Sequence, residues 1–299
     1  MPLPPLRPAR RRMAALASLV RAVPAMTILM PSLLLGNLLQ MASIVTLPFS
    51  MRLFRAINRT IAAAWWGGCV HLARWLHGVK VCVTGDALPA GENAVVMVNH
   101  QSMSDIPVIL DVASLNGRLG DLKWYVKDIL KYVPGIGWGM IFLDCLFIKR
   151  DWTEDRDKIA RVFRRIVKGR VPVWIVSFLE GTRMRPHKLL RSQEYARSRG
   201  LPVFEHVLVP RTKGFAATLE GLGGHAHAVY DFTIGYEEAV PSLSQWAFGY
   251  VRTVHVHIRR TPVAELPVGS EALAAWVVEQ YGQKDRRLDR YYRTGEMAQ

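Results

Sequence analysis

A run without any charged side chain, residues 22–51, constrains the fold of this chain more than any other feature. Its apolar part, residues 25–49, is longer than the ~20 residues with which an α-helix crosses a bilayer. Pro31 and Gly36 interrupt the run near its middle, and arginines flank it on both sides. The sequence therefore predicts an N-terminal membrane-embedded helical segment, either a simple span or a bent, re-entrant hairpin. A cleaved signal peptide is disfavoured, because the stretch is too long and no clear small-residue cleavage site follows.

Charge is distributed unevenly along the chain, whose net charge is +15. The first acidic residue is Asp86, whereas residues 1–85 carry ten Lys or Arg; the remainder carries 29 cations against 24 acids. An N-terminal segment with this excess of positive charge is expected to bind a polyanion, either nucleic acid or anionic lipid. Nucleic-acid binding does not need a long uncharged run, so we expect anionic membrane lipids as partners and no nucleic acid. Each cation near such a surface contributes about 1 kcal/mol.

A second segment, Ile61–Leu76, combines Trp65, Trp66 and Trp75 with Arg74 and two histidines nearby. Aromatic and cationic side chains at this spacing suit a helix that lies on the headgroups. The alternative is an ordinary helix buried in the domain that follows. We therefore expect residues 1–78 to form a membrane-associated helical region.

After Lys80 the sequence alternates short β-rich runs with helical stretches. This alternation predicts an α/β domain over residues 79–299, with a mostly parallel sheet flanked by helices. In such sheets active sites form at the carboxyl ends of the strands. The expected strands are 79–83, 94–98, 123–126, 145–148, 173–178, 206–209, 228–236 and 253–258. The expected helices are 107–114, 153–168, 189–199 and 270–292.

Two expected strand ends carry residues suited to chemistry. His100 follows the strand 94–98, and Asp105 lies five residues later, where a helix starts. An imidazole backed by a carboxylate is a general base with a fixed tautomer. The spacing alone is weak evidence, since random mixing of 9 His and 12 Asp over 299 residues gives about 0.4 such pairs.

The second strand end, Phe178-Leu179-Glu180-Gly181-Thr182-Arg183, suits an anion. Gly181 lets the backbone approach a ligand closely, and Thr182 and Arg183 offer a hydroxyl and a planar fork of donors for a phosphate. A base, a phosphate clamp and a membrane segment together favour an enzyme that acts on a phosphorylated lipid.

At this point the chain resembles the glycerolipid acyltransferases typified by 1-acylglycerol-3-phosphate acyltransferase. Over roughly residues 60–240 it shows the blocks of that family in order: Asn99-His100 with Asp105, Phe147-Ile148-Lys149-Arg150, Phe178–Arg183, and Leu208-Val209-Pro210. The stretch Leu208–Phe215 is similar to the subgroup of lysophosphatidic acid and lysocardiolipin acyltransferases. Leu179 replaces the usual Pro, and Lys127-Asp128-Ile129-Leu130 departs from the Lys-x-Glu-Leu segment of the family.

The resemblance implies acyl transfer from a thioester, acyl-CoA or acyl-carrier protein, to a lysophospholipid hydroxyl, by default 1-acylglycerol-3-phosphate to phosphatidic acid. His100 would take the hydroxyl proton, with Asp105 behind it. Glu180 would orient the cations of the site, or else contact the glycerol hydroxyl. The residues implied for substrate binding are Lys127, Arg150, Glu180, Gly181, Thr182, Arg183 and Pro210.

We expect no cofactor and no metal; His225/His227 and His255/His257 lack supporting Cys or carboxylates. A serine hydrolase is the enzymatic alternative, although no Gly-x-Ser-x-Gly elbow occurs. A membrane-anchored lipid-binding protein without turnover is the alternative from another class. The segment Pro134–Met140 would line an acyl tunnel or else be a packing loop. The excess of Arg over Lys and the abundant Ala suggest a bacterium, hence an inner-membrane location with the active site on the cytoplasmic face.

Overall fold

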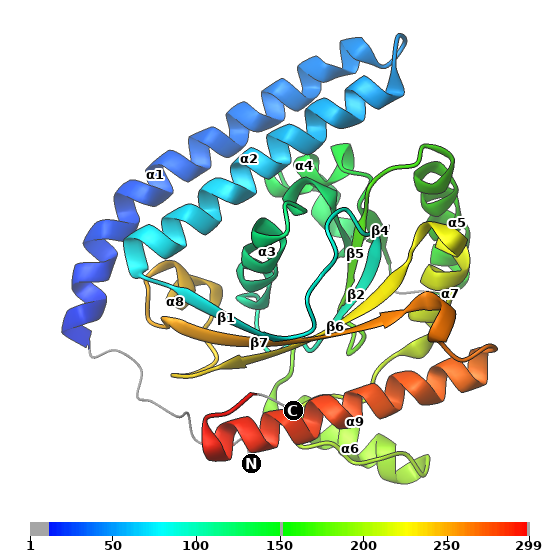
Figure 1. Cartoon of the computed structure of the whole chain (residues 1–299). Coiled ribbons are helices and arrows are strands. Elements are labelled where there is room, and N and C mark those ends of the chain that lie inside the picture. The colour runs from blue at the N-terminus through cyan, green and yellow to red at the C-terminus, as the bar shows by residue number, and fades with distance from the viewer. Residues whose placement is uncertain (1–11, 150–151, 298–299) are drawn as a thin grey trace.

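A seven-stranded sheet forms the centre of the computed structural model, which describes residues 12–149 and 152–297 (Figure 1). The strand order is β1-β7-β6-β2-β5-β3-β4, and every neighbouring pair is parallel except β6 and β7. The prediction of an α/β fold with a mostly parallel sheet is therefore confirmed. The strands are β1 Lys80–Gly85, β2 Ala94–Val98, β3 Leu122–Lys127, β4 Leu146–Ile148, β5 Trp174–Ser177, β6 Ala228–Tyr236 and β7 Thr253–Pro262.

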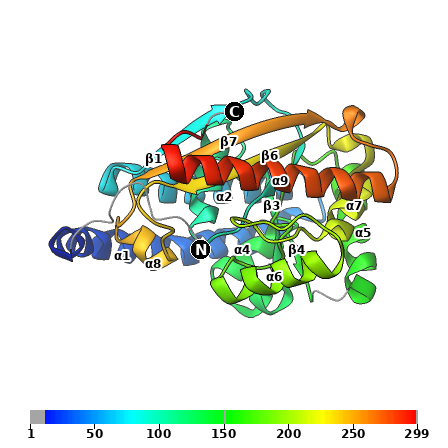
Figure 2. The ribbon, with the colours of Figure 1, turned by 90° about the horizontal axis from the view of Figure 1, so that it is seen from below.

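Helices cover both faces of the sheet (Figures 1 and 2). The central strand β2 is buried at all five positions, as expected for a strand covered on both faces. The α-helices after the first two are α3 Asp105–Leu115, α4 Ile136–Phe142, α5 Trp152–Lys168, α6 Pro186–Ser198, α7 Thr212–Leu222, α8 Leu243–Ala247 and α9 Ser270–Thr294. Short 3₁₀ helices are η1 Ser43–Thr46, η2 Leu119–Asp121, η3 Asp128–Tyr132, η4 Gly223–His225 and η5 Val263–Glu265.

Two apolar cores follow from this arrangement, one on each side of the sheet. The first contains Trp66 of the second helix together with Val108 and Ile109 of α3. The second contains Phe163 of α5, Phe215 of α7 and side chains of α9. The carboxyl ends of β2 and β5 therefore emerge between two filled layers.

The N-terminal segment forms a helical hairpin of α1, Arg12–Ala42, and α2, Met51–His77 (Figure 1). Helix α1 continues through Pro31 and Gly36, and the chain reverses only at 47–50, where Ser50 caps α2 by accepting from the N–H of Leu53. One helical segment, Met26–Thr46, is long and apolar enough to cross a membrane, with a mean hydropathy of 1.7.

Helix α2 lies between α1 and the domain. Its Trp66 is buried in the first core, and the indole N–H of Trp65 donates to the carbonyl of Leu29 in α1 at 3.3 Å. Only Trp75 of the three tryptophans is strongly exposed, at 73%. The tryptophans of this segment thus serve mainly to join the hairpin to the α/β domain.

The strand expected at 206–209 is absent from the described fold, so that prediction is wrong. Its main-chain N–H groups bond to side chains instead of a neighbouring strand. His206 donates to Asp285 of α9 at 2.6 Å, Leu208 to Glu180 at 3.2 Å and Val209 to Ser192 of α6 at 2.9 Å. Because a ladder needs those same donors, the segment is an ordered loop.

Candidate active site

The two sequence motifs meet at one edge of the sheet. His100 follows β2 and Glu180 follows β5, and these strands are parallel neighbours. The amide of Asn99 turns the chain at the end of β2 by bonding both backbone groups of Ile234 in β6, at 2.8 and 3.0 Å. The main-chain N–H of Met184 donates to the carbonyl of His100 at 2.8 Å, which ties the second motif to the first.

His100 and Asp105 form the pair that the spacing predicts. The Nδ1 atom of His100 lies 2.9 Å from Oδ2 of Asp105, whose side chain is fully buried. The same oxygen accepts from the N–H groups of Gln101 and Ser102, at 2.8 and 2.9 Å. These three contacts, together with one from Tyr236, hold the carboxylate of Asp105 in place. A proton on Nδ1 leaves Nε2 as the basic nitrogen of the ring.

Tyr236, at the end of β6, completes the surroundings of Asp105. Its hydroxyl donates to Oδ1 at 2.7 Å. Burial, and then the neighbouring carboxylate, raise the pKa of this hydroxyl well above its ordinary value, so it stays protonated and remains a donor. On the other side, the ring of Phe178 stacks on the imidazole with centroids 4.0 Å apart. The hydrogen bond to Asp105 therefore fixes the rotation of the imidazole, and the stacked ring of Phe178 covers one of its faces.

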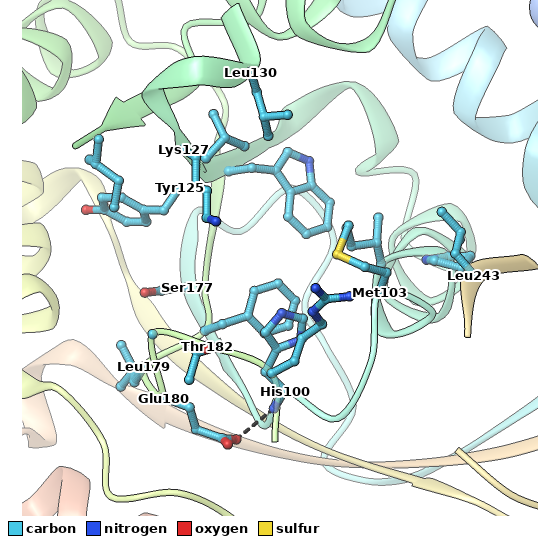
Figure 3. A pocket seen from close by; sticks show the side chains of 18 of the residues that line it. His100, Met103, Tyr125, Lys127, Leu130, Ser177, Leu179, Glu180, Thr182 and Leu243 are labelled. Carbon is cyan, nitrogen blue, oxygen red and sulfur yellow. Dashed lines mark hydrogen bonds between the residues drawn. The ribbon is translucent and has the colours of Figure 1, made fainter. Parts of the chain in front are cut away.

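Glu180 has a different environment from the one expected. Among the described residues, its carboxylate bonds main-chain donors and not cations: Oε1 accepts from His100 at 2.7 Å and Oε2 from Leu208 at 3.2 Å (Figure 3). The side chain is 3% exposed, and burial raises its pKa to about 8. Glu180 thus joins the loops after β2, β5 and α6, and it acts on the site through the position of His100.

Of the residues implied for substrate binding, Thr182 and Arg183 directly follow the turn at Gly181. Gly181 has φ of +68°, and a Cβ there would lie 2.9 Å from Nε of Arg211, so only glycine fits. Thr182 accepts a hydrogen bond from Lys188, while Arg183 and Lys127 are exposed at the cavity described below. Pro210 also lines that cavity. Arg150 lies outside the described residues.

A single large cavity, of about 2010 Å³, connects these groups (Figure 3). One part is polar and contains His100, Lys127, Thr182 and Arg183. The other part runs between the hairpin and the sheet, where apolar side chains line it: Leu29, Met30, Trp65, Leu72, Leu76, Met103, Leu110, Trp124, Met140 and Trp246. The cavity can therefore hold a phosphate and a long acyl chain on either side of one base.

The segment Pro134–Met140 lines the cavity and is also tightly packed, so the structure does not separate the two expected roles. Ile136, Gly137 and Met140 line the cavity. Gly137 is also packed tightly, since a Cβ there would lie 1.8 Å from the carbonyl oxygen of Leu130. The segment is the short helix α4, which the sequence did not predict.

Sequence reasoning missed three polar side chains of the site: Tyr236, Lys188 and Arg211. Tyr236 lies at the end of an expected strand, but its contact with Asp105 requires knowing that β6 pairs with β2. Lys188 and Arg211 lie in or next to helices α6 and α7. The apolar pattern of α7, which starts at Thr212, was the available signal for Arg211.

The paired histidines bind protein groups. His225 bonds the carbonyl of Val171 at 2.7 Å, and His257 bonds the hydroxyl of Thr84 at 3.2 Å. Burial lowers the pKa of His257 to about 4. Within residues 12–149 and 152–297, no group of three His, Cys, Asp or Glu could hold a metal ion.

Comparison with known proteins agrees with the site. The "Acyltransferase" family model matches residues 80–236, and "Acyltransferase C-terminus" matches 249–299. Lysocardiolipin acyltransferase 1 of Danio rerio is 36% identical over 81% of this chain and 63% of its own length. The 1-acyl-sn-glycerol-3-phosphate acyltransferase 2 of Brassica oleracea is 34% identical over 93% of this chain and 73% of its own length.

The fold has a solved counterpart as well. The crystal structure of the 1-acyl-sn-glycerophosphate (LPA) acyltransferase PlsC from Thermotoga maritima covers 93% of this chain and 97% of its own, with a TM-score of 0.59 and 18% identity. The family expected from the His100, Arg150, Glu180 and Pro210 blocks is thus confirmed by independent comparison. With the first model matching more than half of its length, and relatives more than 30% identical over most of it, this chain belongs to the acyltransferase family of 1-acylglycerol-3-phosphate and lysocardiolipin acyltransferases.

Proposed function

We propose that this protein transfers a fatty acyl group from a thioester, acyl-CoA or acyl-carrier protein, to the free hydroxyl of a lysophospholipid. The observation that carries the proposal is the buried Asp105 behind His100 at the edge of a cavity with one cationic and one apolar part. The names of the relatives support lysophospholipids as the acceptor class.

In the proposed mechanism the acceptor hydroxyl is the nucleophile. Nε2 of His100 removes its proton as the oxygen attacks the thioester carbonyl, and Asp105 stabilises the imidazolium that forms. Collapse of the tetrahedral intermediate expels the thiolate, which takes the proton from His100 and leaves as a thiol. General base catalysis of this kind contributes about 10²–10⁴-fold. No covalent acyl-enzyme and no cofactor are required.

The acceptor phosphate is proposed to bind beside Thr182, Arg183 and Lys127, with Arg150 as a further cation. Charge-assisted hydrogen bonds of this type contribute about 1.5–3 kcal/mol each in a desolvated site. The acyl chain of the donor or acceptor then fills the apolar part of the cavity. The default acceptor is 1-acylglycerol-3-phosphate, which gives phosphatidic acid.

A remodelling acyltransferase for another lysophospholipid is the second candidate. The relative named lysocardiolipin acyltransferase 1 favours it, since its 36% identity is as high as that of the 1-acylglycerol-3-phosphate enzymes. A serine hydrolase is the less favoured enzyme, because Ser102 and Ser104 both donate to the carbonyl of Pro241 and Ser177, which lines the cavity, lies in no Gly-x-Ser-x-Gly elbow.

We further propose that the hairpin binds the membrane, in a bacterium the inner membrane with the site on its cytoplasmic face. The candidate span is only 17% buried within the protein, and large apolar side chains such as Leu35, Leu38 and Phe49 are 56%, 58% and 84% exposed. Exposed apolar surface of this extent marks a membrane or protein interface. The apolar part of the cavity borders the same hairpin, so lipid tails have a short path to His100.

The test is an in vitro panel of lysophospholipids and acyl-CoA lengths, with products identified by mass spectrometry. His100→Ala is expected to abolish acyl transfer while the protein stays folded and membrane-bound. A binding protein without turnover would lose nothing on this substitution. Labelling by a fluorophosphonate probe would instead indicate a serine hydrolase.

A further inference from the structure

A second run without charged side chains, residues 132–143, covers the end of η3 and the whole of α4. Four large apolar side chains at and beside this run are 37–68% exposed and lie outside the cavity, so they face the surroundings of the protein. Exposed apolar side chains that gather in one short segment mark a membrane or protein interface. They are Ile129, Tyr132, Trp138 and Ile141.

Helix α4 lies directly against the hairpin (Figure 1). Gly135 and Gly139 permit this close approach. A Cβ at Gly135 would lie 2.8 Å from a methyl group of Leu33 in α1, and one at Gly139 would lie 3.5 Å from the side-chain amides of Asn37 and Gln40. The exposed apolar side chains of α4 are therefore placed beside α1.

The exposed apolar face of α1 borders its contact with α4. Each α1 residue named above is followed directly by an exposed apolar residue, which is Leu34, Leu38 or Met41. Successive residues of an α-helix are about 100° apart, so these three form a stripe next to the contact. All three belong to the helical segment Met26–Thr46 that is long and apolar enough to cross a membrane. The apolar surface of α1 thus continues onto α4.

The charged side chains at the start of the segment suit a membrane surface. Lys131 pairs with Asp128 at 2.8 Å, and its ammonium lies 5.0 Å from the ring centre of Tyr132. With the exposed Lys127 this end of the segment carries one excess positive charge. Lysine stems and tyrosine rings have an apolar body and a polar tip, and both are typical of the boundary between lipid and water.

The segment is also a wall of the cavity. Val133, Ile136 and Met140 line the cavity from this side, and Met26 and Met30 of α1 line it from the hairpin. The two neighbouring elements that expose apolar surface therefore both supply apolar side chains to the cavity.

We propose that the segment Asp128–Phe142 is a second membrane contact, which enters the lipid beside α1. Ile129 and Ile141 lie among the acyl chains, and Tyr132 and Trp138 lie at the level of the headgroups. The inference deepens the membrane binding proposed for the hairpin and rests on it. Lipid is favoured over a protein partner because this surface continues that of a helix with the length and hydropathy of a membrane span.

Spin labels test directly whether the segment enters lipid. In a variant whose half-buried cysteines are replaced by alanine, a label is attached at Ile141→Cys, at Leu38→Cys in α1 as a reference, or at Val268→Cys as an exposed control. In vesicles of anionic lipid we expect the labels at 141 and 38 to be more accessible to oxygen than to a water-soluble nickel complex. The label at 268 should show the reverse. A label at 141 that behaves like the one at 268 overturns the proposal.

The outcomes separate this inference from the rest of the proposed function. A label at 38 in lipid with the label at 141 in water refutes the second contact alone, whereas both labels in water refute membrane binding by the hairpin as well. Spin–spin broadening at 141 would show that a second copy of this chain covers the surface, which also overturns the proposal. Because the measurement needs no turnover, absence of acyl transfer would contradict only the proposed activity.

A kinetic test follows from the same surface. Ile129→Ser/Ile141→Ser removes two apolar side chains that lie outside the cavity. We expect about tenfold weaker binding to anionic vesicles, and a similar rise in KM for a long-chain lysophospholipid presented in them. The values of kcat and of KM for a short-chain, monomeric lysophospholipid should stay unchanged. The control Leu115→Ser/Val268→Ser, at exposed positions elsewhere in the α/β domain, should bind vesicles as wild type does. Equal vesicle binding by the two double variants would refute the contact.

Discussion

At the residue scale, Tyr236 is the clearest test of how the imidazole is positioned. Tyr236→Phe removes the one described donor to Oδ1 of Asp105 and leaves a buried carboxylate oxygen without its partner. Such a loss costs about 1–3 kcal/mol. We expect kcat to fall by about tenfold with KM nearly unchanged, and thermal unfolding to shift down, measured by acyl-transfer kinetics and circular dichroism.

The chain offers a matched control for this change. Tyr291 is fully buried as well, yet its hydroxyl has no hydrogen-bond partner among the described residues. Tyr291→Phe should therefore leave kcat unchanged and be neutral or slightly stabilising. A similar loss of kcat in both variants would show that general packing, and not the bond to Asp105, explains the effect.

Glu180 predicts a pH dependence of stability. Burial raises its pKa from 4.5 to about 8, so the folded state binds the proton more tightly than the unfolded chain. This contribution is complete below about pH 4.5 and is lost as the pH rises towards 8, by up to about 1.4 kcal/mol per unit. We expect the free energy of unfolding of wild type, relative to Glu180→Gln, to fall between pH 5 and 8 in urea titrations. A pH-independent difference would mean that Glu180 is already ionised.

From the sequence, individual residues of the site can be predicted only where they belong to a short local motif. His100 and Asp105 are five residues apart, so a helix start alone brings them together. Tyr236 reaches Asp105 across 131 residues, and the role of Glu180 as an acceptor for the N–H of His100 spans 80. Such contacts depend on strand order, which local pattern does not determine.

At the element scale, α9 is anchored to the sheet by a buried ion pair. Lys284 of α9 is fully buried, bonds Asp231 of β6 and donates to the carbonyl of Phe232 at 2.7 Å. Burial lowers the pKa of Lys284 and raises that of Asp231, because loss of water disfavours both charges, and the attraction between the two opposes this effect. Removing one partner of such a pair costs about 3–5 kcal/mol.

We therefore expect Lys284→Met to lower the free energy of unfolding by about this amount, and Lys284→Met/Asp231→Leu to recover much of it, because neither member of this ion pair then remains as a charge without the other. Denaturant titration of both variants checks this. If the double variant is as unstable as the single one, the cost lies in packing of α9 and not in the orphaned carboxylate.

Element boundaries followed local signals where these were strong. The expected strands 94–98 and 228–236 match β2 and β6 residue for residue, and 153–168 differs from α5 by one residue. The expected strand at 206–209 failed because side chains from α9, α6 and the β5 loop take its N–H groups. Helix α4 was missed because it has only seven residues and contains two glycines, Gly137 and Gly139, which disfavour a helix.

At the scale of the whole molecule, the alternation of strand and helix was sufficient to predict a mostly parallel sheet, and hence one edge where motifs meet. It was not sufficient to predict how the hairpin of α1 and α2 packs on the α/β domain. The same apolar run suits a span or a re-entrant turn; in the structure most of it belongs to helix α1, and packing of α2 against α3 and η2 holds the hairpin to the domain. In that packing α1 lies on the side of α2 that faces away from the sheet (Figure 1), it exposes large apolar side chains, and residues of both helices line the cavity.

Membrane binding through α1 gives the last prediction. Leu35 and Leu38 are more than half exposed, so Leu35→Asn/Leu38→Asn should barely affect folding. If they enter lipid, moving both out of hydrocarbon costs about 2–3 kcal/mol, roughly 30–150-fold in partitioning. We expect this variant to lose most of its co-sedimentation with vesicles of anionic lipid. The control Leu190→Asn/Val268→Asn, at side chains of the α/β domain that are exposed by 61% and 96%, should keep it. Equal binding of the two variants would exclude the hairpin as the membrane contact and leave the cationic surface as its cause.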